Sequence, residues 1–290
     1  MQPAFKKTAV IVAIIAVAIT AFVMLRKQAE PAKVIEQSRP VEAAYEIIGT
    51  SVQGRKIESY TYGTSTKKLV FVGGVHGGYE WNSILLAYQF KDYLDQNPTS
   101  IPAGLSVIVI PNLNPDGVFR VTKKEGRFAI ADVSTSTLIQ ESGRFNANSV
   151  DLNRNFDCKW QPKSTWRSKE VDAGTAAFSE PEASAFRNFI SVAKPSAVVF
   201  WHSQSNTVYA SQCNNGILPQ TLDIMNAYSQ ASLYPDVQTF DAYVTTGAAD
   251  DWLASINIPA ITVELKTHET VEFERNLAGV KALFEYFKVK

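Results

Sequence analysis

Four short apolar runs constrain the fold of this chain more than any other feature of its sequence. They occupy residues 69–75, 105–110, 197–201 and 258–265. Each run is too short for a typical helix, and continuous apolar runs of this length are typical of strands buried on both faces of a sheet. Segments with helical spacing lie between and after them, at 81–94, 179–192, 218–232 and 273–287. This alternation predicts a single α/β domain with a mixed, mostly parallel central sheet and helices on both faces.

The first of these runs ends in residues that carry chemistry. Residues 69–81 read LVFVGGVHGGYEW, so a buried strand breaks at a pair of glycines and is followed by His76 and Glu80. Ligands of open α/β sheets bind beyond the carboxyl ends of the strands. Histidine and glutamate suit Zn²⁺, and a catalytic zinc typically keeps three protein ligands and one water. The stretch alone is equally consistent with a strand-end histidine that is hydrogen-bonded to a glutamate without a metal.

The composition argues against a nucleic-acid partner. Lysine plus arginine and aspartate plus glutamate both number 28, and the globular part has no dense basic stripe. The strong phosphate attraction of a typical nucleic-acid binder is therefore missing. The chain has only three histidines, His76, His202 and His268, so a site that needs two of them can be built in few ways.

The N-terminal region predicts a membrane anchor. Residues 9–25 are apolar except for Thr20 and are flanked by lysines and an arginine, and the run ends without a small-x-small cleavage pattern. A span of this length is at the lower limit for crossing a membrane. We expect an uncleaved signal anchor over 1–27, a linker over 28–43, and a catalytic domain over 44–290 outside the cytoplasm, periplasmic or at the cell surface. A buried core helix is the alternative for this run.

Three further segments have a local interpretation. Residues 46–62 read as two strands around Gly54, and the polar stretch 117–150 reads as irregular. The sequence SEPE at 179–182 is typical of a capping box with a proline in the first helical turn.

Two residues far along the chain complete a possible site. His202 follows an apolar run as His76 does, and Glu264 lies inside the strand-like segment AITVELK. Separately, His202 reads as a hydrogen-bonded core histidine and Glu264 as a partner of Lys266 or another cation. Together with Glu80, they are what a zinc hydrolase requires: His76, Glu80 and His202 as ligands and Glu264 as the general base.

The sequence then resembles the zinc carboxypeptidases of the M14 type, over about residues 45–290. The segments that carry the resemblance are IIGTSVQGRKI (47–57), HGGYE (76–80), PNLNPDG (111–117), GRFNANSVDLNRNFD (143–157), FSEPEA (178–183), FWHS (200–203), YVTTGAADDW (243–252) and ITVEL (261–265). Their order matches that of the family throughout.

The resemblance implies roles for five more residues. Arg144 would polarise the scissile carbonyl and stabilise the oxyanion, and Asn153 and Arg154 would hold the terminal carboxylate of the substrate. Tyr243 would close over bound substrate, and Asp250 would lie at the bottom of the pocket for the terminal side chain, which favours basic or diamino residues. The alternatives are a turn with a surface salt bridge for Asn153 and Arg154, and a helix cap for Asp250.

One departure from the family concerns the first motif. The family usually places its histidine and glutamate three residues apart, whereas Glu80 is four residues after His76. Gly77 and Gly78 must absorb the extra residue if Glu80 is to face a metal.

The central implication of the resemblance, to a bacterial-type membrane-anchored member of the family, is chemical. We expect one Zn²⁺ per chain and a carboxypeptidase that uses a zinc–water and glutamate general-base mechanism. The partners would be the membrane and a peptide or peptidoglycan stem peptide with a free terminal carboxylate, and the protein would be a monomer. The alternatives are a membrane-tethered, non-catalytic peptide-binding protein and a zinc acylase of the aspartoacylase type.

The two cysteines suggest a covalent link near the site. Cys158 lies four residues after Arg154 and Cys213 eleven residues after His202, so each cysteine closely follows a segment that is expected to line the site. Outside the cytoplasm we expect them to form a disulfide. Two free buried thiols are the alternative.

Overall fold

An eight-stranded mixed sheet organises the part of the chain that this computed structural model describes, residues 43–289. In spatial order its strands are β1 (Ala44–Thr50), β2 (Lys56–Tyr62), β4 (Ser106–Ile110), β3 (Lys68–Val72), β7 (Ala197–Ser203), β12 (Ala260–Leu265), β8 (Thr207–Ala210) and β11 (Asp236–Val237). The four predicted apolar runs form β4, β3, β7 and β12, which are parallel neighbours at the centre. The predicted mixed, mostly parallel sheet is confirmed.

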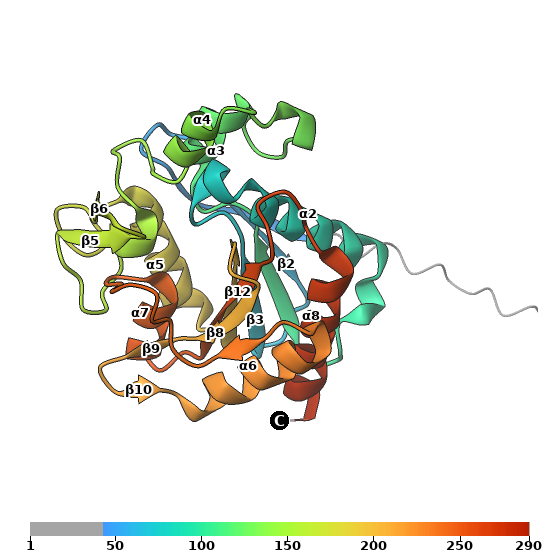
Figure 1. Ribbon diagram of the computed structural model, residues 1–290. Helices are drawn as coiled ribbons and strands as arrows, with labels where there is room; N and C mark the ends of the chain where they lie inside the picture. Colours follow the sequence, from blue (N-terminus) through green and yellow to red (C-terminus); the bar gives the residue numbers. More distant parts are fainter. Residues whose placement is uncertain (1–42, 290) are drawn as a thin grey trace, which may run out of the picture. The chain divides into compact units, whose positions relative to one another are not determined.

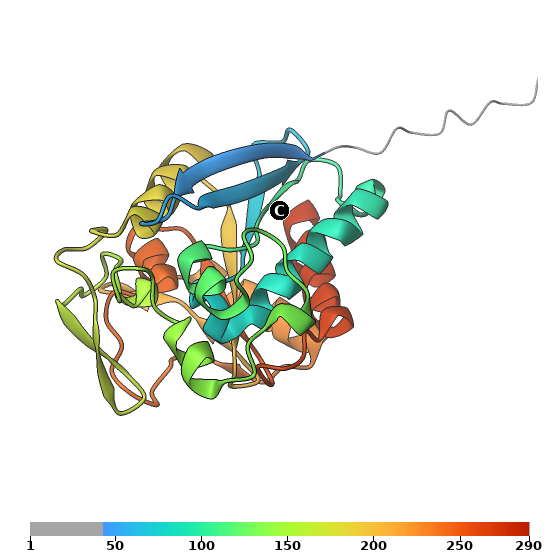
Figure 2. The same ribbon diagram turned by 90° about the horizontal axis from the view of Figure 1, so that it is seen from above.

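The outer strands make the sheet mixed. β1 and β2 pair as an antiparallel hairpin at one edge, visible as the blue ribbons in Figure 2, and β2 is antiparallel to β4. At the other side β8 is antiparallel to β12, and β11 is parallel to β8. Two small hairpins lie outside this sheet: β5 (Lys163–Trp166) with β6 (Lys169–Asp172), and β9 (Gln212–Cys213) with β10 (Gly216–Ile217).

Helices cover both faces of the sheet, as predicted (Figure 1). One face packs against α2 (Trp81–Gln96), α6 (Pro219–Ser232) and α8 (Phe273–Val289), and the other against α5 (Pro181–Ala193) and α7 (Ala249–Ser255). Side chains of β3 alternate between the two cores: Leu69 and Phe71 join the first, and Val70 and Val72 the second. This period of two is the geometry of a strand buried on both faces.

Aromatic rings fill the first core between the sheet and α2. Phe71 of β3, Phe90 of α2 and Trp201 of β7 are almost fully buried, and their ring centroids lie 5.0 to 5.7 Å apart. Such pairs contribute about 0.5–1.5 kcal/mol each beyond their buried area. The packing fixes α2, and with it the residue that precedes this helix, Glu80.

The prediction that residues 117–150 are irregular is wrong. The segment holds most of α3 (Pro115–Thr122), a 3₁₀ turn η3 (Ile130–Asp132) and α4 (Thr137–Ser142). Asn114 caps α3, because its side-chain oxygen accepts a hydrogen bond of 2.9 Å from the Gly117 amide, and Pro115 occupies the first helical position. The sequence NPDG is therefore a helix start rather than a turn alone.

The predicted capping box before α5 is also wrong, although the helix begins at Pro181 as expected. Glu180 occupies the cap position, and no side chain caps the helix. The Ser179 hydroxyl instead donates to Glu180 Oε1 at 3.0 Å. Ser179 also accepts from the Asn155 amide at 3.0 Å.

The N-terminal anchor and most of the linker lie outside the described residues. Between residues 43 and 289, no helix is both long and apolar enough to cross a membrane. The predicted domain boundaries therefore stay a prediction.

Candidate active site

Three buried side chains meet where neighbouring strands end. His76 follows β3, Glu80 ends a 3₁₀ turn η1 (Gly77–Glu80) just before α2, and His202 lies near the end of β7. One ligand atom from each lies within 4.8 Å of the others. His202 Nδ1 is 2.9 Å from Glu80 Oε2, and His76 Nε2 is 4.0 Å from Glu80 Oε1. Because β3 and β7 are parallel neighbours, their carboxyl ends bring the two histidines to one place.

The two glycines of HGGYE allow the four-residue spacing. Gly77 has a φ of +46°, and a Cβ there would lie 2.6 Å from the carbonyl oxygen of Gly143. A side chain at this position is therefore excluded both by conformation and by space. The turn closes through a hydrogen bond from the Tyr79 amide to the His76 carbonyl, 3.2 Å, and runs directly into α2. Glu80 consequently faces the histidines.

The cluster fits a zinc ion. Two histidines and one carboxylate leave a position for water, as in catalytic zinc sites. Burial, reinforced by Arg144, lowers the pKa of His76 to about 4, so its ring is neutral and able to bind a metal. Burial alone would raise the pKa of Glu80, but His76 and His202 lower it to about 2. His76 Nδ1 is buried without a hydrogen-bond partner and lies 3.4 Å from Asp151 Oδ1.

Glu264 lies beside this cluster because β12 pairs with β7. The register places Glu264 opposite His202. Burial, followed by the charge of Glu80, raises the pKa of Glu264 to about 7. Between residues 43 and 289 Glu264 takes part in no ion pair, so it is not paired with Lys266 or another cation; the charged groups beside it, His202 and Arg144, pair with Glu80. A carboxyl group that titrates near neutral pH is suited to general-base chemistry.

Arg144 is buried and held firmly next to the cluster. Its Nε donates a hydrogen bond to Asp151 Oδ2 at 2.9 Å, its Nη2 forms an ion pair with the same oxygen at 2.8 Å, and its Nη1 lies 3.8 Å from Glu80 Oε1. The guanidinium carbon is 4.6 Å from the centroid of the Trp166 ring. Because two nitrogens contact Asp151, the guanidinium has a defined orientation toward the cleft.

Asn153 and Arg154 lie in the 3₁₀ turn η4 (Leu152–Arg154). Arg154 is buried, and its guanidinium donates to the carbonyls of Thr165 (3.0 and 3.2 Å) and Asn153 (2.6 Å). Burial lowers the pKa of Arg154. Asn153 Oδ1 accepts a hydrogen bond from the Ala249 amide, 2.9 Å. In the described part of the chain Arg154 has no carboxylate in salt-bridge range, so the surface salt-bridge interpretation is wrong.

Tyr243 and Asp250 form another wall. The ring of Tyr243 packs against that of Phe240, with centroids 4.8 Å apart. The helix-cap interpretation of Asp250 is wrong, because α7 begins after Ala248 and has no side-chain cap. Asp250 Oδ2 accepts a hydrogen bond from Thr262 Oγ1, 2.9 Å. Burial and the neighbouring Asp250 raise the pKa of Asp251 to about 8, so Asp251 is mainly neutral at pH 7.

One cleft of about 260 Å³ joins these groups. All nine residues predicted from the sequence line it: His76, Glu80, Arg144, Asn153, Arg154, His202, Tyr243, Asp250 and Glu264. Their assembly depends on turns and strand ends from six separate parts of the chain.

Sequence reasoning missed the groups that support these residues. Asp151 contacts both His76 and Arg144, and its position at the start of DLNRNF was the available signal. The Ser203 amide donates to Glu80 Oε2 at 3.2 Å. The Ser203 hydroxyl lies 2.7 Å from Nδ1 of His268, the third histidine, to which no role was assigned from the sequence.

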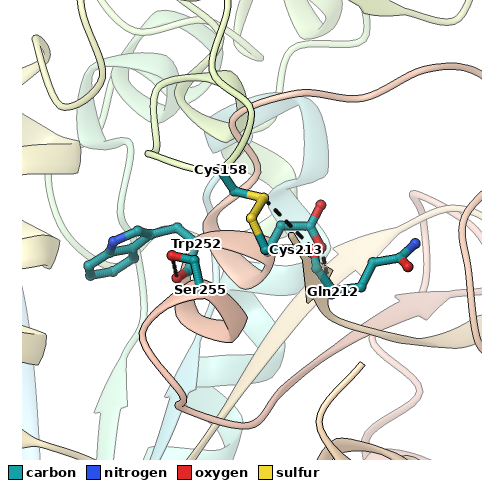
Figure 3. The surroundings of a disulfide bond; sticks show 6 residues. Cys158, Gln212, Cys213, Trp252 and Ser255 are labelled. Atoms are coloured by element: carbon teal, nitrogen blue, oxygen red, sulfur yellow. Dashed lines mark hydrogen bonds between the residues drawn. A yellow bond between two sulfur atoms is a disulfide. The ribbon is translucent and has the colours of Figure 1, made fainter. Parts of the chain in front are cut away.

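A disulfide joins Cys158 to Cys213, which confirms the predicted pairing (Figure 3). The bond connects the segment after η4 to β9, with Trp252 and Ser255 of α7 nearby. Next to it, the Gln212 amide donates to Asp251 Oδ1, 2.9 Å. The bond therefore ties two walls of the cleft together.

The chain is similar to several known proteins. A family profile described as zinc carboxypeptidase matches residues 32–278. The gamma-D-glutamyl-L-diamino acid endopeptidase 1 of Lysinibacillus sphaericus is 26% identical over 240 residues, which cover 75% of this chain and 59% of that protein. This chain spans between 57% and 63% of the length of three curated relatives that it matches.

Solved structures have the same fold. Murein-tripeptide amidase MpaA from Escherichia coli O157 superposes with a TM-score of 0.60 at 21% identity, covering 84% of this chain and 92% of that one. Carboxypeptidase A from Helicoverpa armigera gives 0.63 at 19% identity, covering 86% and 68%. The profile match extends over most of the chain and includes every residue of the cluster and the cleft described above. The chain therefore belongs to the zinc carboxypeptidase family, peptidase M14.

Proposed function

We propose that this protein is a zinc-dependent carboxypeptidase that removes the terminal residue of peptides with a free carboxylate. The observation that carries the proposal is the single cleft that joins a candidate zinc cluster, a carboxyl group with a near-neutral pKa, and the buried Arg154. Arg154 contacts carbonyl oxygens and no carboxylate among the described residues, so a carboxylate of the substrate is a fitting partner.

The mechanism follows from the positions of the chain's own groups. A zinc ion held by His76, Glu80 and His202 would polarise the scissile carbonyl and lower the pKa of a water. Glu264 takes a proton from the attacking water and returns it to the leaving nitrogen. Arg144 donates to the developing oxyanion, where a preorganised charge is most effective.

Substrate binding uses the other end of the cleft. Asn153 and Arg154 hold the terminal carboxylate, and Tyr243 closes over the bound peptide. The carboxylate of Asp250 receives the terminal side chain and favours a cationic one, because a neutral side chain leaves this charge unpaired.

We propose peptidoglycan stem peptides as a substrate class and a location outside the cytoplasm for the catalytic domain. The names of two similar proteins, an endopeptidase for gamma-D-glutamyl-L-diamino acid bonds and a murein-tripeptide amidase, support the substrate. The disulfide supports the location, because such bonds persist in oxidising compartments. Membrane attachment through residues 9–25 and a monomeric state complete the proposal.

The test is an assay of the purified full-length protein on blocked dipeptides and muropeptides. We expect about one zinc per chain, and release of the terminal residue that stops on chelation and returns with zinc. A folded, unchelated sample that holds less than about a tenth of an equivalent of zinc would contradict the metal assignment. Full zinc without release of any terminal residue would favour a binding protein, and cleavage of N-acyl amino acids alone would favour an acylase.

A further inference from the structure

A third arginine lines the cleft and has no role in the proposed mechanism. Arg167 follows β5 at the tip of the β5–β6 hairpin and is exposed. Its Nη2 donates to the Tyr79 hydroxyl at 3.0 Å, and its guanidinium carbon is 5.4 Å from the Trp166 ring centroid. In the described part of the chain no carboxylate lies within salt-bridge distance of Arg167. The cleft thus has a cation at its rim that lacks an anionic partner.

The order of residues along β5 and the turn after it shows where the Arg167 cation lies relative to a bound peptide. The carbonyl of Thr165 accepts hydrogen bonds from Arg154, the next ring, Trp166, lies 4.6 Å from Arg144, and the next residue, Arg167, reaches Tyr79. β5 ends at Trp166, and Arg167 begins the turn that follows, with a φ of +56°. The chain therefore passes from the group that would hold the terminal carboxylate, past the group at the scissile carbonyl, to Arg167 in the turn.

Tyr79 gives this arginine a fixed neighbour. The residue immediately precedes the candidate ligand Glu80, and its ring packs against Trp166 and His268 with centroids 5.2 and 4.6 Å apart. The Tyr79 hydroxyl is a neutral group that accepts the hydrogen bond from Arg167, so it orients the guanidinium without supplying a counter-charge.

We propose that Arg167 binds a carboxylate on the acyl side of the scissile bond. This inference rests on the proposed function, which places the terminal carboxylate at Arg154 and the scissile carbonyl at Arg144. The planar guanidinium can bind a carboxylate through two hydrogen bonds. Two kinds of acyl residue supply one: a γ-linked glutamyl residue, whose α-carboxylate is free, and an α-linked acidic residue, whose side chain is free.

Two matched pairs of blocked dipeptides ending in lysine test this with the full-length zinc protein. The first pair has γ-linked D-glutamate with its α-carboxylate either free or converted to the amide, and the second has α-linked glutamate or glutamine. For the wild type we expect kcat/KM to be about three- to tenfold higher for the acid than for the amide in at least one pair, mainly through KM. The pair that shows the preference identifies the source of the carboxylate.

Variants of Arg167 test whether this residue causes the preference for the acid. Arg167→Gln should bring the acid-to-amide ratio close to one, and Arg167→Lys should keep part of it because the charge remains. Lys169→Gln is the matched control, since Lys169 lies on the same hairpin, pairs with Glu141 at 3.6 Å and does not line the cleft. Its ratio should equal that of the wild type.

Two results separate the proposals. Hydrolysis by the wild type with ratios near one in both pairs, or a ratio unchanged by Arg167→Gln, overturns the role of Arg167 and leaves the carboxypeptidase intact. Hydrolysis of none of the dipeptides or muropeptides by the zinc-loaded wild type overturns the proposed function and the role of Arg167 with it.

Discussion

Asp151 connects the candidate metal cluster to the arginine at the scissile carbonyl. Its carboxylate is fully buried and contacts His76 with one oxygen, and its other oxygen accepts a hydrogen bond from Arg144 Nε and forms an ion pair with Arg144 Nη2. Burial alone would raise the pKa of Asp151, but the charge of Arg144 holds this pKa well below its usual range. Asp151 is therefore ionised and orients both groups at once, as carboxylates behind metal-binding histidines do.

Asp151→Asn should weaken zinc binding about 10- to 100-fold, because the amide cannot accept from both partners and leaves Arg144 without its counter-ion. Competition with a chelator of known affinity measures this change. Asp157→Asn is the matched control, since Asp157 is exposed in the same segment. If the zinc affinity of Asp151→Asn is within threefold of the wild type, a difference of about 0.7 kcal/mol, Asp151 does not support the zinc site.

Glu264→Gln should keep zinc and fold but lose most turnover. The amide fills the same space and cannot take a proton, and loss of a general base typically costs about 10²- to 10⁴-fold. Metal analysis and steady-state kinetics on the same preparation separate the two effects. Activity close to that of the wild type would exclude Glu264 as the base.

Asp250→Ala should abolish a preference for a terminal lysine. A partly desolvated charge pair discriminates more strongly than a methylene does, so we expect a wild-type Lys:Leu ratio of kcat/KM above about ten. The Asp250→Ala variant should give a Lys:Leu ratio near one. The control Asp241→Ala removes an exposed carboxylate two residues before Tyr243 and should keep the wild-type ratio. An unchanged ratio in Asp250→Ala would assign the selectivity to another group.

The residues that do chemistry were more predictable than those that support them. His76, His202 and Glu264 stand out because each ends or interrupts an apolar run. A polar group in such a place is costly to bury unless it has a hydrogen-bonding, ionic or metal partner. Asp151 and Ser203 border polar stretches, where hydrophobicity alone gives no sign that a carboxylate or hydroxyl will be buried. Their roles depend on contacts between segments far apart in the chain, such as the one from Ser203 to Glu80.

At the scale of elements, the pattern of apolar residues determined which strands and helices could be predicted. The runs that became β3, β4, β7 and β12 need cover on both faces, so their place at the centre of the sheet followed from hydrophobicity. The β5–β6 hairpin carries Trp166 and Arg167, yet its sequences KSTW and KEVD contain no apolar run. The helix α3 was missed because it is short and contains Gly117, which lowers helix propensity.

Glu182 joins elements from three parts of the chain through a buried carboxyl group. Its Oε1 accepts from the Val52 amide in the turn after β1 at 3.1 Å, and its Oε2 accepts from Asn146 at 3.2 Å. Burial raises the pKa of Glu182 to about 7. The folded state therefore holds this proton more tightly than the unfolded state does.

A raised pKa makes the contribution of Glu182 to stability pH-dependent. That contribution is fully present below about pH 4.5 and is lost as the pH rises toward 7, by roughly 3 kcal/mol in total. Glu182→Gln cannot ionise, so its unfolding free energy relative to wild type should increase over this range by that amount. Urea unfolding at several pH values tests this, with exposed Glu274→Gln as control. A difference between variant and wild type that is constant with pH would contradict the prediction.

At the scale of the whole described region, the cleft depends on segments held together across the sheet. Residues 151–158 supply Asn153 and Arg154, and the segment from β9 to α7 supplies Asp250 and part of the opposite wall. A hydrogen bond from Ala249 to Asn153 joins these two segments, and one from Gln212 to Asp251 joins β9 to α7. The disulfide makes this connection covalent, and the sequence predicted it from the expected compartment and from the two segments expected to line one site.

Replacing both cysteines by serine should therefore destabilise the protein and loosen the cleft. The bond closes a loop between residues separated by 55 positions, and the loss of such a constraint on the unfolded chain costs about 2–4 kcal/mol. Denaturant unfolding of the zinc-loaded proteins measures the change, and a reducing agent should lower the stability of the wild type but not of the Cys158→Ser/Cys213→Ser variant. We also expect KM to rise more than kcat falls, because the bond positions groups that bind the terminal residue rather than the zinc ligands. Two reactive thiols in the unreduced, denatured wild type would contradict the bond and remove the main structural support for a location outside the cytoplasm.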